Sequence, residues 1–380
     1  MKNKLPKLIL IGSVPPPHHG VTVYVEKLLK SNINDAFYIK HLDISDHRDT
    51  TNFNKLDIKN IKIGISNIFS LVVELIRFKP DLVYCTPAPY IFPFFRESCF
   101  IFLTKIFSKA KIVAHIHAGE FFRINFYDKS NVLVKLLIKQ TFRYCDCGIV
   151  LGKNLVKYYD LFFNQTVVLW NGIEISKNGN GSNYYNKKLD YNNINISFLS
   201  NLCENKGIIT LIKALSQLSK EAKNKLRFQI AGDWLANEDE TRKLFYQLIK
   251  DNDLSEKISI LGGLYSSKKK NLFYQNCDIF IFPTNMDAFP LVILEAMLNG
   301  CAVISTYEGA IPELVIDGET GFLLEKNDHE KLAEKIFELI NSPEKIVNFG
   351  NNGRNRIIKY FTLDHNVNGL KNIFNDLLHC

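Results

Sequence analysis

The strongest fold signal in this 380-residue chain is the stretch Phe282-Pro-Thr-Asn-Met-Asp-Ala-Phe-Pro-Leu-Val-Ile-Leu-Glu-Ala-Met297. It begins where an apolar run, Asp278 to Phe282, predicts a buried strand of a parallel sheet. A short loop follows, and Leu291 to Asn299 then has the composition of a helix that Gly300 would end. Loops at the carboxyl ends of parallel strands are where α/β proteins bind ligands. We therefore expect a ligand site at this loop.

Two carboxylates mark the expected site. Asp287 lies in the loop and Glu295 in the helix, with seven residues between them. This spacing places one acid at the mouth of the site and the other about a turn along the helix wall. The free amides and the positive dipole end of the helix suit a phosphate group.

Apolar strands alternate with helical stretches along the whole chain, which predicts two parallel α/β sheets. The expected strands are Leu8–Gly12, Phe37–Leu42, Asp81–Cys85, Lys111–His115, Gly148–Leu151 and Val167–Trp170 in the first series, and Asn195–Leu199, Phe228–Ala231, Ile258–Leu261, Asp278–Phe282, Ala302–Ser305 and Gly321–Leu324 in the second. The polar, glycine-rich segment between the two series predicts a hinge. We expect domains at 1–175 and 191–362, a hinge at 176–190, and a last helix within 363–380.

The acid-x7-acid spacing, the tail Phe289 to Met297 and the later Gly309-Ala-Ile-Pro-Glu313 resemble the retaining glycosyltransferases of the GT-B fold, family 4. The resemblance implies two Rossmann-like domains that face a cleft, with a C-terminal helix that crosses back to the first domain. It covers nearly the whole chain. Asp287 stands where the family usually has Glu, and Pro290 where it usually has Gly.

The resemblance also implies roles for the residues of the second domain. Asp287 would contact the donor sugar and Glu295 the nucleotide ribose. Lys206 and the amides at the helix start would hold the diphosphate. The family has Gly-Arg where this chain has Ser200-Asn201, so Asn201 would offer a hydrogen bond in place of a cation. The expected catalytic residues are His117, Lys206 and Asp287, and the expected donor-binding residues are Gly20, Asn201, Lys206, Ala288, Phe289, Pro290, Leu291, Val292 and Glu295.

Two motifs of the first domain match the family less closely. Gly20 ends the proline-rich loop after the first strand, where a glycine lets a ligand approach the backbone; an ordinary βα turn explains it as well. His115 and His117 follow the fourth strand. We expect the two rings to point to opposite faces, with His115 in the core. The resemblance implies that His117 faces the donor sugar, as a positioning residue or a proton relay.

The net charge and the cysteine pattern limit the classes of partner and cofactor that we expect. The net charge of +8 indicates an anionic partner, but no nucleic-acid-binding module is present. The eight scattered cysteines include no Cys-x-x-Cys pair, which favours a reduced, cytoplasmic chain, and we expect no metal and no cofactor. Lys268–Lys270 is expected to be a solvated helix start. The aromatic segment Tyr90–Phe107 fits either a buried helix or a membrane-interface helix, which leaves a peripheral position at the inner face of the membrane open.

The resemblance therefore implies a retaining, metal-independent hexosyltransferase that uses a nucleotide-diphosphate sugar, with UDP favoured. Its acceptor would be a saccharide or a lipid-linked saccharide in bacterial surface glycan assembly. Two alternatives remain. One is a nucleotide-sugar epimerase or hydrolase on the same fold. The other is a non-catalytic partner subunit, which the replacements at Asn201 and Asp287 would suit.

Overall fold

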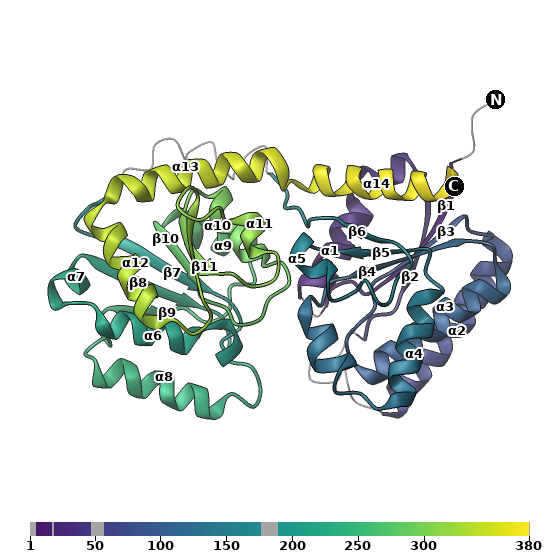
Figure 1. The fold of residues 1–380 in the computed structure, drawn as a ribbon, viewed down its shortest axis with the longest axis horizontal. Helices are drawn as coiled ribbons and strands as arrows, with labels where there is room; N and C mark the ends of the chain where they lie inside the picture. The colour runs from purple at the N-terminus through teal and green to yellow at the C-terminus, as the bar shows by residue number, and fades with distance from the viewer. Residues whose placement is uncertain (1–4, 17–18, 47–56, 176–188, 380) are drawn as a thin grey trace. The chain divides into compact units, whose positions relative to one another are not determined.

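The structure, a computed structural model, describes residues 5–16, 19–46, 57–175 and 189–379. It divides the chain into two compact units. Unit 1 contains Met1–Asn171 and Asp364–Cys380, and unit 2 contains Gly172–Leu363 (Figure 1). Most of the expected hinge falls on residues 176–188, which lie outside the described residues.

Unit 1 is built on a six-stranded parallel sheet in the order β2-β1-β3-β4-β5-β6. The strands are β1 Lys7–Gly12, β2 Tyr38–Asp43, β3 Leu82–Cys85, β4 Lys111–Ile116, β5 Cys147–Val150 and β6 Thr166–Val168. The helices are α1 Gly20–Lys30, η1 Asn32–Asp35, α2 Ile58–Phe78, α3 Ile91–Phe107, η3 Phe122–Tyr127, α4 Val132–Arg143, α5 Lys153–Val156 and α14 Leu363–His379. The side chains of Leu8 to Ile11 are buried, as expected for a parallel sheet covered on both faces.

Unit 2 repeats this plan with the strand order β12-β11-β10-β7-β8-β9. The strands are β7 Ile194–Leu199, β8 Leu226–Ala231, β9 Ile258–Ile260, β10 Ile279–Phe282, β11 Ala302–Thr306 and β12 Gly321–Leu324. The helices are η5 Glu204–Lys206, α6 Ile208–Gln217, α7 Lys220–Asn224, α8 Asp239–Asp251, α9 Ser267–Gln275, α10 Leu291–Leu298, α11 Ile311–Leu314, α12 His329–Asn341 and α13 Pro343–Tyr360.

All twelve expected strands are present, with ends shifted by no more than two residues. The expected last helix is α14, which packs on unit 1. Its Phe374 ring lies 5.4 Å from the ring of Phe37, and its Asn366 accepts a hydrogen bond from the Tyr24 hydroxyl at 3.2 Å. The predicted two-domain α/β fold with a returning C-terminal helix is confirmed.

Strand order reverses once in each unit, and such a reversal opens a crevice at the carboxyl edge of the sheet. In unit 1 the reversal lies between β1 and β3, and in unit 2 between β7 and β10. The loop after β1 leads to Gly20, and the loops after β7 and β10 carry Lys206 and Asp287. The fold therefore brings the predicted residues of each unit to the edge where ligands bind.

None of the described helices combines the length and the apolar character needed to cross a bilayer. The seven described cysteines are free thiols. Among the described residues, no three His, Cys, Asp or Glu side chains are grouped so that they could hold a metal ion.

Candidate functional site

The site in unit 2 begins with two loops that hydrogen-bond to each other. The loop after β7 supplies the Asn205 carbonyl oxygen, which accepts from the Asn285 amide at 2.8 Å and from the Thr284 hydroxyl at 3.1 Å. β7 and β10 are neighbours in the sheet, so their loops leave its edge side by side. This pairing gives the residues of both loops a fixed position.

Two glycines allow the loop after β7 to approach the loops after β10 and β8 closely. Gly207 has a φ of +78°, and a Cβ there would lie 1.9 Å from the Pro283 carbonyl oxygen. Gly232 has a φ of +133°, and a Cβ there would lie 1.7 Å from the Ser200 carbonyl oxygen. Only glycine fits such positions without displacing the neighbouring backbone. The turn at Gly232 thus serves the geometry of the loop.

Lys206 and Asp287 form an ion pair at the contact of the two loops. The Lys206 Nζ lies 2.6 Å from Asp287 Oδ2 and donates to the Met286 carbonyl oxygen at 3.1 Å. Their side chains are 24% and 19% exposed, so a ligand can still reach both. The other Asp287 oxygen, Oδ1, accepts from the Phe289 amide at 3.2 Å. The loops therefore present one cation and one carboxylate in contact at the edge of the sheet.

Glu295 lies on α10 and has two partners from α9 that the sequence did not indicate. Lys270 Nζ donates to Oε1 at 2.8 Å, and the Tyr274 hydroxyl donates to Oε2 at 2.9 Å. Burial raises the pKa of Tyr274 well above its usual value, and the Glu295 charge raises it further. The phenol therefore remains a donor at neutral pH. The expectation that Lys268–Lys270 is only solvated surface was wrong for Lys270, whose target is 25 residues away in the sequence.

The start of α10 is arranged differently from the prediction in one respect. Phe289 and Pro290 are buried, and the Phe289 ring packs 6.2 Å from that of Phe361. Proline has no N–H, so Pro290 donates no hydrogen bond. Leu291 and Val292, both half-buried, are the first residues of the helix, where amides have no acceptor within it. These two amides, and not that of Pro290, are the donors available to an anion.

Ala288 is half-buried, and its carbonyl accepts from the Ala310 amide at 2.9 Å.

Asn201 is exposed directly after β7, and its side chain forms no hydrogen bond with the described residues. Lys206 is the one cationic residue in segments 200–207 and 283–290. The loops after β7 and β10 therefore concentrate their positive charge at a single ammonium group.

In unit 1, the two histidines lie on the same side of β4, and the expected opposite orientation was wrong. Their ring centroids are 4.2 Å apart. Side chains in an extended segment alternate faces with a period of two, so residues two apart share a face. His115 is fully buried, with Nδ1 2.7 Å from the Tyr84 hydroxyl, as expected for a core histidine.

His117 is held in a setting that keeps it neutral. Its ring lies 4.9 Å from that of Tyr24, and its Nε2 is buried with no hydrogen-bond partner among the described residues. Burial lowers its pKa to about 3, with a smaller contribution from the charge of His19. A neutral imidazole can donate or accept a hydrogen bond but carries no charge at pH 7. The effect of its charge on this pKa shows that His19 lies near His117. The predicted site did not include His19.

Gly20 is the first residue of α1 and is exposed. A Cβ at Gly20 would meet no atom within 4 Å. The fold therefore does not require glycine here, and the space above the backbone is open. Thr22 closes the turn, because its hydroxyl accepts from the His19 amide at 3.1 Å.

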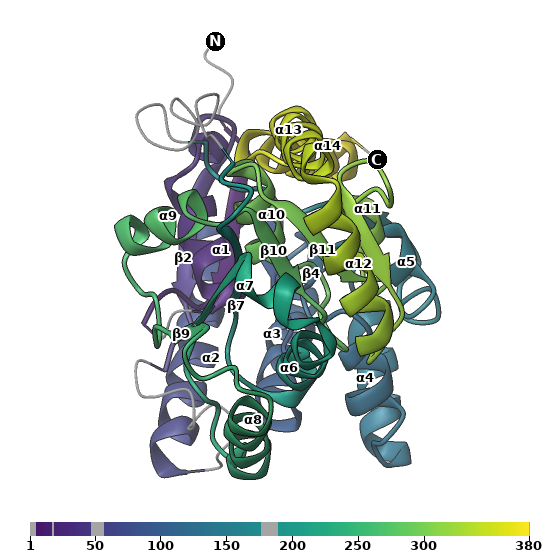
Figure 2. The ribbon, with the colours of Figure 1, turned by 90° about the vertical axis from the view of Figure 1, so that its left-hand side faces the viewer.

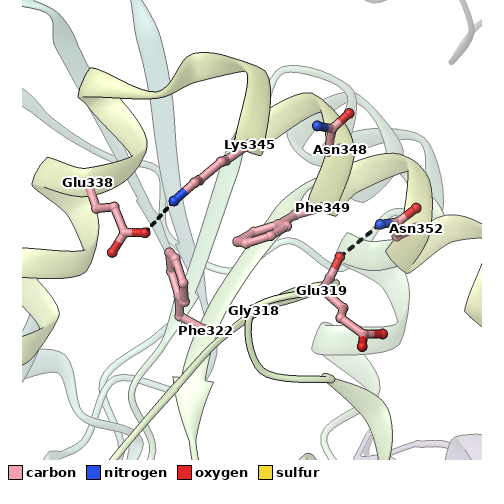
Figure 3. A pocket seen from close by; sticks show the side chains of 8 residues that line it. All are labelled: Gly318, Glu319, Phe322, Glu338, Lys345, Asn348, Phe349 and Asn352. Carbon is pink, nitrogen blue, oxygen red and sulfur yellow. Dashed lines mark hydrogen bonds and ion pairs between the residues drawn. The ribbon is translucent and has the colours of Figure 1, made fainter.

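A pocket of about 520 Å³ lies elsewhere in unit 2 (Figure 3). Its lining includes Phe322 near the start of β12 and Phe349 on α13, but no residue of the loops after β7 and β10. One of its two acids, Glu338, accepts hydrogen bonds from Lys335 and Lys345 at 2.7 Å each, and these bonds lower the pKa of its carboxyl group. None of the predicted site residues lines this pocket, so the candidate site lies at the carboxyl edge of the sheet and not here.

Comparison with known proteins shows which families the chain is similar to. Residues 186–356 match the family model described as Glycosyl transferases group 1. The chain is 26% identical to an uncharacterized glycosyltransferase of Methanocaldococcus jannaschii over 97% of this chain and 98% of that protein. It is 29% identical to the capsular polysaccharide biosynthesis glycosyltransferase CapM of Staphylococcus aureus over 55% of this chain and 53% of that protein.

Solved structures show the same fold. Sucrose-phosphate synthase from Thermosynechococcus elongatus superposes with a TM-score of 0.75 at 15% identity, covering 98% of this chain and 99% of that one. The Anabaena protein HepE, solved in complex with UDP, gives 0.74 at 18% identity, covering 98% and 100%. The chain has the GT-B fold. The family match and the glycosyltransferase relatives support assignment as a glycosyltransferase.

Proposed function

We propose that the protein is a retaining, metal-independent glycosyltransferase that moves a hexose-type sugar from a nucleotide-diphosphate sugar, with UDP favoured, to a saccharide or lipid-linked saccharide. The observation that carries this proposal is the Lys206–Asp287 pair, formed at the strand-order reversal of unit 2. The UDP complex of HepE and the capsular role of CapM support the donor and a task in bacterial surface polysaccharide assembly. The protein would act in the cytoplasm or at the inner membrane face.

The donor would bind along the edge formed by the loops after β7 and β10. Lys206 and the Leu291 and Val292 amides would hold the diphosphate, because helix starts and cations both attract phosphate. Glu295, oriented by Lys270 and Tyr274, would accept hydrogen bonds from the ribose hydroxyls. Asn201 would add one hydrogen bond. Ala288 and the backbone on either side of it would position the sugar.

The ion pair gives Lys206 and Asp287 a common role. Without donor, each neutralises the other at 2.6 Å. A bound diphosphate would share or replace Asp287 as the partner of Lys206. The Asp287 carboxylate would then be available to accept from sugar hydroxyls. The pair thus keeps both side chains in position before the donor arrives, which is the preorganisation that favours catalysis.

The chemical step would break the bond between the anomeric carbon and the diphosphate oxygen. The acceptor hydroxyl would form the new bond on the same face, and its proton would pass to the leaving phosphate. Negative charge grows on the diphosphate as its bond breaks, and the Lys206 ammonium would stabilise that charge. From unit 1, neutral His117 would hydrogen-bond a sugar hydroxyl, and the open backbone at Gly20 would admit substrate.

Product analysis tests the proposal. The protein is incubated with UDP-hexoses, with and without saccharide acceptors, and the products are analysed by NMR. A new glycoside with the anomeric configuration of the donor is expected, formed only when acceptor is present. Free sugar or an epimerised donor without any acceptor would instead establish the hydrolase or epimerase alternative. An inverted product would contradict the retaining mechanism.

The ribose contact gives a second, sharper prediction. Glu295→Gln removes the charge and keeps the shape, and hydrogen bonds to charged groups contribute about 1.5–3 kcal/mol. We expect the Kd for UDP to rise about tenfold or more, because tenfold corresponds to about 1.4 kcal/mol. Binding of 2′,3′-dideoxy-UDP, which lacks the hydroxyls, should change little. Tyr274→Phe should show the same selectivity with a smaller loss. Calorimetric titration measures the affinity of the unmodified protein and of each variant for both nucleotides.

Glu334→Gln, at an exposed position of α12, is the matched control and should bind both nucleotides as the unmodified protein does. An equal loss of affinity for UDP and its dideoxy analogue in Glu295→Gln would place Glu295 away from the ribose.

A further inference from the structure

Three neighbouring helices of unit 1, α2, α3 and α4, expose an unusual amount of apolar side chain. α3 lies between the other two, and Figures 1 and 2 show the three together in one layer over the sheet. The exposed apolar residues of this layer are Ile58, Ile61, Ile65, Phe69 and Ile76 on α2, Ile91, Phe92, Phe95, Ile106 and Phe107 on α3, and Val132, Leu133 and Leu136 on α4. We call this surface the outer face of the helix layer.

The apolar residues on α2 follow helical spacing. Ile58, Ile61, Ile65 and Phe69 recur at steps of three or four, so they form one stripe along the helix. Ile58 is 73% exposed and Phe69 is 70% exposed. The residues that α2 buries, Leu71 and Leu75, lie in its second half. The stripe is therefore additional to the face that α2 packs against unit 1.

α3 has the same two-sided character. Phe94, Phe100 and Ile101 are buried, whereas Phe95 is 60% exposed and Ile106 is 70% exposed. The sequence left two alternatives for this segment, a buried helix or a membrane-interface helix. The first describes only one face of α3, because the other face is exposed. Large exposed apolar surfaces mark sites where proteins contact other proteins or membranes.

The charge of the three helices indicates whether a protein or a membrane contacts this surface. The three helices contain eight basic residues, Lys59, Lys62, Arg77, Arg96, Lys105, Lys135, Lys139 and Arg143, and only two acidic ones, Glu74 and Glu97. Glu74 is paired with Lys40 at 3.2 Å, and Glu97 is buried, where it accepts from the Ala88 amide at 2.7 Å. Lys105 is paired with Asp146 at 2.9 Å. The three helices therefore combine a net positive charge with their exposed apolar side chains.

We propose that the outer face of the helix layer binds the surface of an anionic phospholipid bilayer. The apolar side chains would enter the boundary between headgroups and acyl chains, and the lysines and arginines would contact lipid phosphates. A second copy of the chain is a poorer occupant, because a symmetric interface would bring the two positive faces together. No described helix can span a bilayer, so the contact would be peripheral.

This inference does not depend on the proposed transferase activity, although a lipid-linked acceptor would suit it. Vesicle co-sedimentation tests it with the full chain. The vesicles contain phosphatidylcholine alone, or phosphatidylcholine mixed with phosphatidylglycerol. We expect binding to the anionic vesicles, with much weaker binding to the neutral ones, and a loss of binding as salt concentration rises.

Two variants separate the apolar and electrostatic contributions. Lys59→Glu/Lys62→Glu should weaken binding to anionic vesicles by roughly 25-fold or more, since each surface lysine contributes roughly fivefold. Ile65→Ser/Phe69→Ser should weaken it by about tenfold or more. All four residues are exposed, so thermal melting should match that of the unmodified protein.

Matched controls come from unit 2. Phe337→Ser, at a side chain that is 50% exposed on α12, and Lys243→Glu/Lys250→Glu on α8 should leave vesicle binding unchanged. Equal binding by every variant would overturn the proposal, as would the absence of binding to anionic vesicles. A dimer that the α2 substitutions dissociate, with no vesicle binding, would overturn it in favour of a second copy. Nucleotide binding, measured separately, would not be affected by any of these outcomes.

Discussion

Lys206→Met should lower the turnover number about 100- to 1,000-fold, the loss found when one preorganised donor to a developing charge is removed. The reason is that Lys206 is the single cation of the loops after β7 and β10. Asn201 stands where the glycosyltransferase family that this chain resembles has an arginine. The Km for the donor should change much less, because the charge on the diphosphate increases only as the sugar bond breaks. Steady-state kinetics with a UDP-sugar and acceptor measures both quantities.

The ion pair requires a control for structure. Methionine at position 206 leaves Asp287 without its partner at 2.6 Å, which could alter the loop. The double variant Lys206→Met/Asp287→Asn removes that unpaired charge and should remain slow. Lys331→Met, at an exposed lysine paired with Glu334 on α12, should have normal kinetics. A turnover number within roughly threefold of that of the unmodified protein would exclude Lys206 from leaving-group stabilisation.

Acid should destabilise unit 1 through His115 and His117. Burial lowers the pKa of His115 well below 6.5 and that of His117 to about 3. Between these values and 6.5 the unfolded chain binds a proton at each histidine and the folded protein does not. The free energy of unfolding therefore falls as the pH falls below 6.5, by about 1.4 kcal/mol per pH unit for each histidine.

Glu97 acts in the opposite direction within the same unit. Burial raises its pKa to about 7 from an ordinary value of 4.5. Between 4.5 and 7 the folded protein binds a proton at Glu97 that the unfolded chain lacks, so this group adds stability as the pH falls. Between pH 4.5 and 6.5, the contribution of Glu97 to the slope of unfolding free energy against pH cancels about that of one histidine.

Substitutions separate the two contributions. His117→Gln should reduce the slope of unfolding free energy against pH by about 1.4 kcal/mol per unit, and Glu97→Gln should increase it by a similar amount. Denaturant unfolding at several pH values between about 4.5 and 6.5 gives the slopes. Unchanged slopes in both variants would mean that neither group is buried as described.

The low pKa of His117 also implies that this residue does not set the pH profile of activity.

The sheets could be predicted from the sequence because a buried parallel strand is apolar throughout. Phe280 and Ile304 are fully buried within such runs, and short loops separate these runs from helical stretches. The expected position of the candidate site follows from the same pattern, since parallel strands end at one edge. Gly300 ended α10 as expected, with a φ of +71°.

Contacts between residues far apart in the sequence could not be predicted in this way. Lys270 and Tyr274 reach Glu295 only because α9 packs near α10, and nothing in the composition of α9 indicates that partner. The buried hydroxyl of Tyr84 beside His115 is a similar case. The orientation of His117 relative to His115 was predictable from the two-residue period of a strand, and the expectation failed because that period was misapplied.

The most direct test of the central claim is calorimetric titration of the purified protein with UDP, GDP and ADP. We expect UDP to bind at a single site, GDP and ADP to bind more weakly, and Glu295→Gln to weaken UDP binding. A ligand that binds only the folded protein also raises its melting temperature, which provides a check that the signal is specific. Absence of binding by all three nucleotides to well-folded protein would contradict the account and would favour a non-catalytic partner subunit.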